Sequence, residues 1–280
     1  MRTAGVDGRR ALAERSGRAT NRPVKPRHSE APAQRAERVY GLSAALAAFA
    51  QRPAAVVNIA YTQDARKPLA DMLREAARLR IAYREVDNAT LTSMAESVHH
   101  EGVCLLVRPR ENLAIASIAA GLGEQCLVIA LDGVQNPHNV GAILRSAAYF
   151  GADALIYASE QDKPLTAAAR RVAEGGAERL VVRSVPDLSA ALGSFVEHGL
   201  SLVGCDTRAK LRLDTFRWPR RALLILGHEQ HGLSPAVRGM CQSLVRIAGA
   251  DTLDSLNVSV TAGIFLSSFA NAQAARSGSP

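Results

Sequence analysis

Aromatic residues are scarce in this chain, making up 4% of its 280 residues. Proteins that hold single-stranded nucleic acid by stacking successive bases need several rings, so the composition argues against that mode of binding. The four cysteines, Cys104, Cys126, Cys205 and Cys241, form no Cys-x-x-Cys pair. Their spacing supports neither a zinc ribbon nor a disulfide scaffold, and we expect buried thiols in a reducing compartment.

Long apolar runs are also missing. No run reaches the ~18 residues that a membrane span needs, and the first residues contain no hydrophobic signal core. We therefore expect a cytoplasmic protein without a membrane segment. The adjacent residues His99, His100 and Glu101 invite a metal interpretation. Neighbours in one loop rarely converge on one ion, so a turn with a functional polar edge is favoured and no metal is expected.

Positive charge is in excess, with a formal net charge of +8. Such an excess indicates a polyanionic partner rather than a fold. Residues 1–37 hold nine Lys and Arg against four Asp and Glu, so 9 − 4 = +5 of this charge lies there. The segment has no apolar periodicity and is predicted to be a disordered basic arm. It would serve either as a solubilising tail or as a nonspecific RNA anchor through phosphate contacts.

Residues 38–110 are predicted to form a small α/β domain, since 48% of the chain is hydrophobic and helical and strand patterns alternate here. The predicted helices are 39–49, 68–79 and 89–98. The predicted strands are 54–61, 81–86 and 102–107.

A linker is predicted at 111–123, which contains Gly121-Leu122-Gly123. These residues fail as a dinucleotide-binding fingerprint. The third glycine position is Cys126, and the motif precedes a strand where it should follow one. A Rossmann-type dehydrogenase or methyltransferase therefore loses its main sequence support.

Residues 124–280 are predicted to form a second domain in which continuous apolar strands alternate with helices. The predicted strands are 126–131, 154–157, 180–182, 200–204, 222–226 and 244–247. The predicted helices are 139–150, 165–174, 187–197, 234–241 and 258–273. This order favours a mostly parallel sheet covered by helices on both faces, whose ligands bind beyond the carboxyl ends of the strands.

Polar residues gather directly after three of the predicted strands. The first cluster, 132–145, holds Asp, Gln, two Asn and His after a buried strand, and Arg145 in the helix that follows. Asn139 is placed to cap that helix. Placing so many polar side chains beside a buried strand costs free energy unless they bind a partner or ligand.

The second cluster, 227–234, reads Gly-His-Glu-Gln-His-Gly-Leu-Ser. It is one residue short of the zinc-binding His-Glu-x-x-His pattern, and its flanking glycines argue against a helix. Gly227 and Gly232 instead predict a tight loop whose backbone approaches a ligand closely.

The third cluster lies at 253–265, where Asp254, Ser255 and Asn257 precede a helix that contains small residues. Ser255 or Asn257 is expected to cap that helix. Its free N–H groups and the positive end of its dipole also suit a phosphate or carboxylate ligand.

Three segments then carry a resemblance: Asn-Val-Gly-Ala-Ile-Leu-Arg at 139–145, the run at 227–234, and Ser-Leu-Asn-Val-Ser-Val at 255–260. They resemble, in the same order, the three motifs of the SpoU/TrmH branch of the SPOUT RNA methyltransferases. The chain departs from that pattern at 248–249, where Ala-Gly replaces Pro and a bulky residue, and at Asp251, where Gly is common.

Residues 38–108, with Val-Tyr-Gly-Leu at 39–42 and His-His-Glu-Gly-Val at 99–103, resemble the substrate-binding domain of members that act on large-subunit ribosomal RNA. The resemblance implies an α/β fold in which a small substrate-binding domain precedes a C-terminal domain with a trefoil knot, an exception to the rule against threaded chains.

The resemblance also implies a homodimer that binds S-adenosylmethionine and methylates a ribose 2′-hydroxyl of structured RNA, ribosomal RNA rather than transfer RNA. Carried over by position, Gly227, Ile247 and Leu256 would contact the cofactor, largely through backbone groups and apolar walls.

The catalytic residues that it implies are Asn139, Arg145, Glu229, Ser255 and Asn257. In the family, the residue at the Arg145 position is proposed to take the hydroxyl proton, with Asn139 and Glu229 orienting it. Guanidinium groups seldom deprotonate, which favours a second role. Arg145 would bind the target phosphate or the developing alkoxide, while Ser255 and Asn257 complete the anion site.

Two other functions fit the same residues. One is a noncatalytic RNA-binding or ribosome-assembly protein that keeps the fold, supported by the altered segment 248–251. The other is a 2′-O-methyltransferase that acts on transfer RNA. The separate domain at 38–110 leans toward ribosomal RNA.

Overall fold

A computed structural model of the chain describes residues 36–159, 163–250 and 253–278. Almost all of the predicted basic arm lies outside these residues, and so does Asp251. Glu37, the last residue assigned to the arm, is the first residue of a strand. Within the described ranges, no helix is both long enough and apolar enough to cross a membrane.

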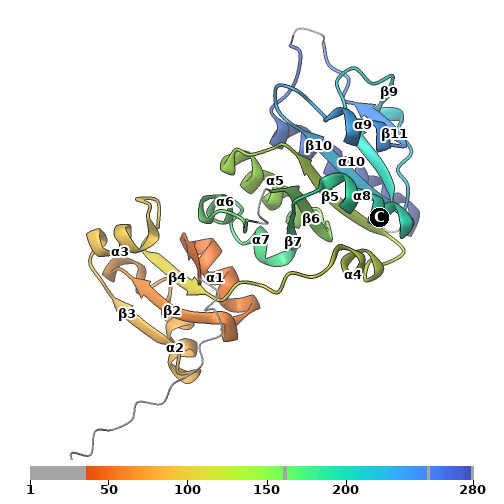
Figure 1. Cartoon of the computed structure of the whole chain (residues 1–280). Helices are drawn as coiled ribbons and strands as arrows, with labels where there is room; N and C mark the ends of the chain where they lie inside the picture. Colours follow the sequence, from red (N-terminus) through yellow and green to blue (C-terminus); the bar gives the residue numbers. More distant parts are fainter. Residues whose placement is uncertain (1–35, 160–162, 251–252, 279–280) are drawn as a thin grey trace, which may run out of the picture. The chain divides into compact units, whose positions relative to one another are not determined.

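The N-terminal part of the described chain is built on a four-stranded sheet (Figure 1). Its strand order is β1-β4-β2-β3, with β1 and β2 antiparallel to β4, and β3 parallel to β2. The strands are β1 (Glu37–Tyr40), β2 (Val56–Tyr61), β3 (Ala82–Glu85) and β4 (Val103–Val107). The helices are α1 (Leu42–Gln51), α2 (Ala70–Arg78) and α3 (Asn88–Ala95).

The predicted helix over 39–49 is wrong in its first residues. Val39 and Tyr40 instead belong to β1, opposite residues 105 and 104 of β4. Gly41 follows with φ 92°, a left-handed backbone that glycine adopts without strain, so the helix starts only at Leu42. Both strand residues are buried, and pairing with β4 outweighs the local helical spacing.

The C-terminal part is built on a seven-stranded sheet in the order β7-β6-β5-β10-β8-β11-β9. Every pairing in it is parallel, which confirms the predicted mostly parallel sheet. The two-residue β9 was not predicted. The strands are β5 (Cys126–Asp132), β6 (Ala154–Ala158), β7 (Val181–Val185), β8 (Ser201–Cys205), β9 (Leu211–Arg212), β10 (Arg221–Gly227) and β11 (Ser243–Arg246).

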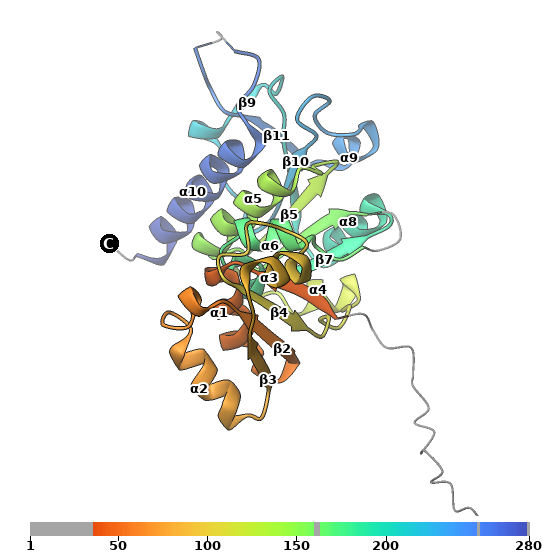
Figure 2. The ribbon, with the colours of Figure 1, turned by 90° about the vertical axis from the view of Figure 1, so that its left-hand side faces the viewer.

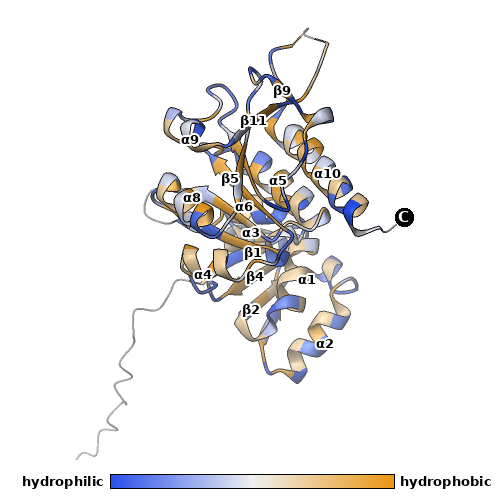
Figure 3. Ribbon diagram, turned by 90° about the vertical axis from the view of Figure 1, so that its right-hand side faces the viewer, coloured by the Kyte–Doolittle hydropathy of each residue, from blue (hydrophilic) through white to orange (hydrophobic). Residues whose placement is uncertain are grey.

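Helices cover both faces of this sheet, as predicted. They are α4 (Ile115–Ala120), α5 (Pro137–Tyr149), α6 (Ala167–Val172), α7 (Gly176–Arg179), α8 (Leu188–Glu197), α9 (Pro235–Met240) and α10 (Val258–Ser277). Side chains alternate along β5, so Ile129 packs with α5, α6 and α10 while Val128 packs with α4, α8 and α9. Figure 3 shows the apolar strands lying between these helices, and Figure 2 shows α5 beside α10.

Two helices in this part were not predicted as such. The segment predicted as one helix over 165–174 is α6, and a second short helix, α7, follows it. Glu174 and Gly175 separate the two with φ 45° and 88°, left-handed conformations that end a helix. The predicted linker also contains α4, whose Ile118 and Ala119 are buried against the sheet.

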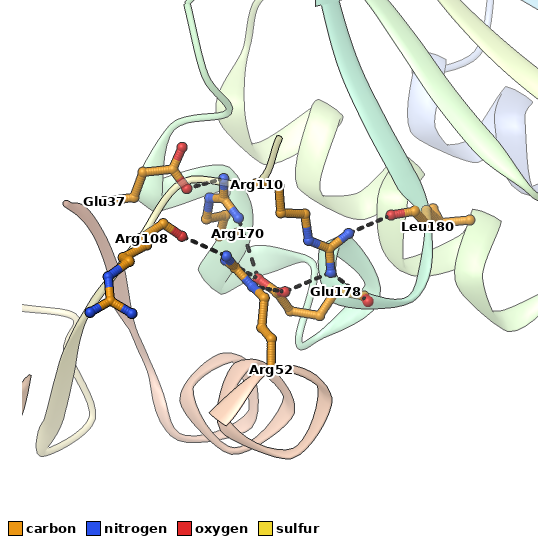
Figure 4. Close-up of polar contacts among 7 residues, drawn as sticks. All are labelled: Glu37, Arg52, Arg108, Arg110, Arg170, Glu178 and Leu180. Carbon is orange, nitrogen blue, oxygen red and sulfur yellow. Dashed lines mark hydrogen bonds and ion pairs between the residues drawn. The ribbon is translucent and has the colours of Figure 1, made fainter. Parts of the chain in front are cut away.

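A buried carboxylate joins the N-terminal part to the C-terminal part (Figure 4). The side chain of Glu178 in α7 is only 3% exposed. It accepts from Arg52 at the end of α1 (2.9 Å), from Arg110 after β4 (2.8 Å) and from Arg170 in α6 (3.3 Å). Arg170 also donates to Glu37 of β1 at 2.7 Å. Each arginine therefore ties a different segment to one buried charge.

The arginines also bind backbone carbonyls, which fixes the segment that follows β4. Arg110 donates to the carbonyl oxygens of Glu178 and Leu180, and Arg52 donates to that of Arg108. Burial would raise the pKa of the Glu178 carboxyl, but hydrogen bonds and charges from Arg52, Arg110 and Arg170 outweigh burial. The pKa of Glu178 consequently lies below its ordinary value.

Glu178→Gln should destabilise the protein strongly, because it leaves three arginines without their shared counter-charge. Breaking a buried ion pair from one side costs about 3–5 kcal/mol, and chemical denaturation would measure that loss.

The same substitution should change the pH dependence of stability. The folded-state pKa of Glu178 is lowered from 4.5, so its contribution is complete above that value and is lost as pH falls through the lowered pKa. Wild type should therefore lose more stability than Glu178→Gln below about pH 4.5. Equal acid sensitivity of the two proteins would contradict the assignment.

Candidate functional site

The register between β5 and β10 brings the first two polar clusters together. The two strands run parallel, with Gly227 opposite Asp132 at their carboxyl ends. The loops that follow therefore leave the sheet side by side. A hydrogen bond from the backbone N–H of Ser234 to Asp132 Oδ2, at 2.6 Å, fastens the second loop to the end of β5.

A chain of side-chain hydrogen bonds then links all three clusters. Asn139 Nδ2 donates to Glu229 Oε1 at 2.7 Å, and Asn257 Nδ2 donates to Asn139 Oδ1 at 3.2 Å. Asn257 Oδ1 accepts the backbone N–H of Ser259 at 2.8 Å, so Asn257 is the N-cap of α10. Asn139 is 90 positions from Glu229 and 118 positions from Asn257, so three residues far apart in the sequence meet at one place.

The N-cap of α5 is Asn136, and the prediction that Asn139 caps this helix is wrong. Asn136 Oδ1 accepts the backbone N–H of His138 at 2.9 Å. Pro137 follows it at the first helical position, where a fixed φ and a missing N–H cost nothing. Asn139 lies within the first turn, which leaves its side chain available to Glu229 and Asn257.

The second cluster forms a tight loop that closes on itself. His228 and Gly232 exchange backbone hydrogen bonds of 3.0 and 2.8 Å, and Gly232 has φ 68°. A Cβ at Gly227 would lie 2.3 Å from the carbonyl carbon of Gly232. Only glycine fits at 227, and the close approach that it permits is to the loop's own backbone. The rings of His228 and His231 stack with centroids 4.8 Å apart.

Beside this loop is a cavity of about 340 Å³. Gly227, Glu229, Ser255 and Leu256, all site residues inferred from the sequence, line it. Ile247 packs against the core of the C-terminal part and is not among the lining residues. The other lining residues come from the end of β8 and the loop after it, the end of β10 and the loop after it, α9, and the start of α10 with the segment before it: Cys205, Asp206, Thr207, Arg208, Leu226, His228, Gln230, His231, Gly232, Leu233, Arg238, Asp254, Val258 and Thr261.

Asp206 was missed by the sequence reasoning. It is 9% exposed, accepts the backbone N–H of Arg208 at 2.8 Å, and forms an ion pair with Arg238. It stands directly after β8, so the rule that pointed to the other clusters applies to it too. Cys205 lies next to it, and burial raises the pKa of that thiol to about 12, so the thiol stays protonated at neutral pH.

Arg145 does not lie with the other predicted catalytic residues. It is six positions after Asn139 on α5, which places it roughly 9 Å further along the helix and about 120° around it. Its guanidinium is bound to Glu174 at 2.6 Å. Together with His138, it lines a second cavity of about 340 Å³.

The His-His-Glu run at 99–101 is a turn with a polar edge, which was the favoured interpretation. His100 is buried, with Nδ1 accepting the N–H of Gly102 at 3.1 Å and Nε2 lying 3.1 Å from Thr92 Oγ1. Burial lowers the pKa of His100. Glu101 points the other way, toward α1 and α6.

Comparison with known proteins gives the family. The SpoU rRNA methylase family matches residues 126–267, and the family of RNA 2′-O ribose methyltransferase substrate-binding domains matches residues 38–113. The chain belongs to the SpoU rRNA methylase family.

Members with related sequences cover most of the chain. An uncharacterized tRNA/rRNA methyltransferase, YfiF, from Escherichia coli O157:H7 is 35% identical over 83% of this chain and 68% of its own length. The 23S rRNA (guanosine-2′-O-)-methyltransferase RlmB of Vibrio cholerae is 32% identical over 82% of this chain and 94% of its own.

Solved structures of the family have the same fold. The SpoU methyltransferase AviRb from Streptomyces viridochromogenes, in complex with the cofactor AdoMet, aligns with a TM-score of 0.72 at 25% identity. The alignment covers 85% of this chain and 90% of that chain. An RNA 2′-O ribose methyltransferase aligns with a TM-score of 0.71 at 24% identity, over 86% and 90% of the two chains.

Gly227→Ala should open the 227–234 loop and damage the first cavity, because its Cβ would overlap backbone atoms that cannot move aside. Overpacking of this kind costs about 1–3 kcal/mol, equivalent to roughly 10- to 100-fold in affinity. Titration calorimetry with S-adenosylmethionine would measure the loss.

Gly193→Ala is the matched control, since a Cβ there would meet nothing within 4 Å. It lies inside α8, where alanine is the better helix former, and it should bind the ligand like wild type. Equal binding by both variants would contradict this account of the loop.

Proposed function

We propose that this chain transfers a methyl group from S-adenosylmethionine to a ribose 2′-hydroxyl of structured RNA, with ribosomal RNA as the substrate class. The observation that carries the proposal is the hydrogen-bonded chain Glu229–Asn139–Asn257, which joins all three motif segments at the rim of one cavity. Relatives named 23S rRNA (guanosine-2′-O-)-methyltransferases support the substrate class.

The residues around the first cavity suit S-adenosylmethionine. Small-molecule sites measure about 300–1,000 Å³, and the volume of this cavity, about 340 Å³, falls in that range. Backbone groups of the 227–233 loop would serve the edges of adenine. Leu226, Leu233 and Leu256 offer apolar walls, and Asp206 offers an acceptor for hydroxyl or amino groups. Ile247 would act indirectly, by supporting the wall from the core.

The bound cofactor supplies an activated methyl group, so the chain's task is to position the RNA. Holding two reactants in line can supply roughly 7–11 kcal/mol. Asn139 is held on both sides, by Glu229 and by Asn257, which fixes both ends of its amide. Ser255 and the N-terminus of α10 present donors at the same rim, where a developing negative charge on the ribose oxygen would be stabilised.

Arg145 is proposed to act as an anion clamp for the RNA. Its guanidinium pairs with the Glu174 carboxylate at 2.6 Å, and a guanidinium offers paired donors that suit a phosphate or a developing alkoxide. The alternative role, acceptance of the hydroxyl proton, needs a neutral guanidinium, which proteins seldom provide.

The finer features that the family resemblance implies belong to the same proposal. We propose a substrate-binding domain at 38–110, a linker at 111–123, and a methyltransferase domain at 124–280 with a trefoil knot and a cytoplasmic location. We also propose a homodimer. Val260 and Ile264, one turn apart on α10, are 50% and 37% exposed, and exposed apolar faces of this kind favour association.

Incubation of the purified chain with S-adenosylmethionine carrying a deuterated methyl group tests the function. Ribosomal and transfer RNA would be offered separately, and the nucleosides would be analysed by mass spectrometry. A labelled 2′-O-methyl nucleoside from ribosomal RNA is expected. Label in transfer RNA alone would favour the second substrate. Cofactor-free protein with tight RNA binding would favour the noncatalytic alternative.

Arg145→Ala should lower the methyl-transfer rate by about 10²–10³-fold, the usual cost of one lost charge-stabilising donor. Its affinity for S-adenosylmethionine should stay within about twofold, because Arg145 lines a different cavity. Single-turnover rates and calorimetry measure the two quantities. Loss of cofactor binding would reassign the residue.

A further inference from the structure

Two motif segments of the N-terminal part, 39–42 and 99–103, meet at Arg171 of the C-terminal part. The proposed function gives Arg171 no role. Arg171 of α6 donates to Glu101 Oε1 at 3.1 Å. Glu101 Oε2 in turn accepts the backbone N–H of Leu42, the first residue of α1, at 2.9 Å. A Cβ at Gly41 would lie 2.7 Å from Arg171 Cγ. The segments 39–42 and 99–103 therefore converge on one arginine.

Arg171 and Arg145 line the same second cavity. Its lining residues come from α1 and the turn before β4 in the N-terminal part, and from α5, α6 and Glu174 after α6 in the C-terminal part. Its lining residues are Gly41, Ser43, Ala44, Glu101, His138, Arg145, Arg171, Val172 and Glu174. Two guanidinium groups and two carboxylates thus face one space that both parts of the chain build.

The second cavity begins next to the hydrogen-bonded chain that borders the first. His138 and Arg145 are seven residues apart on α5, close to two full turns, so they share one face of the helix. His138 is the direct neighbour of Asn139, which is bound to Glu229 and Asn257. The cavity therefore runs along α5 from the rim of the cofactor cavity to the N-terminal part.

Both arginines are held by carboxylates that are themselves about half exposed. The side chains of Arg145 and Glu174 are 59% and 46% exposed, and those of Arg171 and Glu101 are 25% and 47% exposed. The Arg145–Glu174 pair is exposed, and exposed pairs contribute about 0–1 kcal/mol, whereas the Arg171 side chain is half-buried. Each pair is joined by one hydrogen bond, from Arg145 Nη1 to Glu174 Oε1 and from Arg171 Nη1 to Glu101 Oε1, and a guanidinium can bind a phosphate through two parallel hydrogen bonds.

We infer that the second cavity is the docking site for the RNA backbone beside the target ribose, with Arg171 as a phosphate ligand and Glu101 and Glu174 as the carboxylates that RNA displaces. The inference rests on the proposed function and names the surface that receives the substrate. A ribose at the Asn139 end of α5 would place its neighbouring phosphates toward Arg145 and Arg171. If these ion pairs only supported the fold, the glutamate variants would not bind RNA more tightly than wild type.

Binding of in-vitro-transcribed 23S ribosomal RNA, measured by filter retention between 50 and 200 mM salt, tests the inference. Arg171→Ala should weaken RNA binding about 5- to 20-fold and make the salt dependence shallower by about 0.7–0.9, the value of one phosphate contact. Glu101→Gln and Glu174→Gln should instead tighten RNA binding, because each removes a competing negative charge. The glutamine at 101 retains an oxygen that can cap Leu42.

Arg78→Ala and Glu75→Gln provide matched controls. These residues form an exposed ion pair on α2 at 2.6 Å and line no part of the cavity, so neither change should alter RNA affinity or its salt dependence. Thermal unfolding and S-adenosylmethionine affinity confirm that each variant is folded. For the Arg171, Glu101 and Glu174 variants, both should match wild type.

An unchanged salt dependence in Arg171→Ala would overturn the inference. Weaker RNA binding by both Glu101→Gln and Glu174→Gln would also overturn the inference. If the ion pairs only supported the fold, replacing either the arginine or the glutamate would destabilise the protein and weaken RNA binding. The proposed function fails separately, when wild type binds the RNA and S-adenosylmethionine but transfers no methyl group.

Discussion

The parallel pairing of β5 with β10 is the constraint on which the site depends. Because the two strands end at the same edge, in register, the loop after Asp132 and the loop after Gly227 leave the sheet together. Glu229 can then reach Asn139, and Asn139 can reach the cap of α10. A shift of the register by one residue would turn every core side chain of β10 to the other face, and close packing against the helices on both faces opposes such a shift.

The buried carboxylate of Glu178 holds the N-terminal part against the C-terminal part. The Glu178 carboxylate binds Arg52 at the end of α1, Arg110 after β4 and Arg170 in α6. The cost of removing this carboxylate from water is offset only while these arginines are bound. The second cavity lies between elements that this joint connects. The structure thus separates two tasks. Under the proposed function the rim of the first cavity would hold the cofactor and the ribose oxygen, and under the further inference the second cavity would receive the RNA backbone.

The sequence predicted the elements of the seven-stranded sheet well, because strands buried on both faces are continuous apolar runs. It also placed an N-cap before α10, where polar residues stand directly ahead of a helical pattern. It failed where a distant partner decides the outcome. Residues 39–40 have helical spacing yet pair with β4, and Pro137 moved the cap of α5 to Asn136.

The least predictable features are the side-chain contacts between distant segments. Arg171 and Glu101 are 70 residues apart, and Arg52 and Glu178 are 126 apart. No periodicity in a single sequence relates such positions. Asp206 is different, since it follows a strand like the other clusters and could have been found by the same rule.

Hydrogen–deuterium exchange of the purified chain, with and without S-adenosylmethionine, tests the central claim that three loops form one pocket. Residues 133–139, 227–234 and 253–258 should all become protected over the same range of ligand concentration. Protection confined to one of these segments, or protection that appears in them at different concentrations, would contradict a shared pocket.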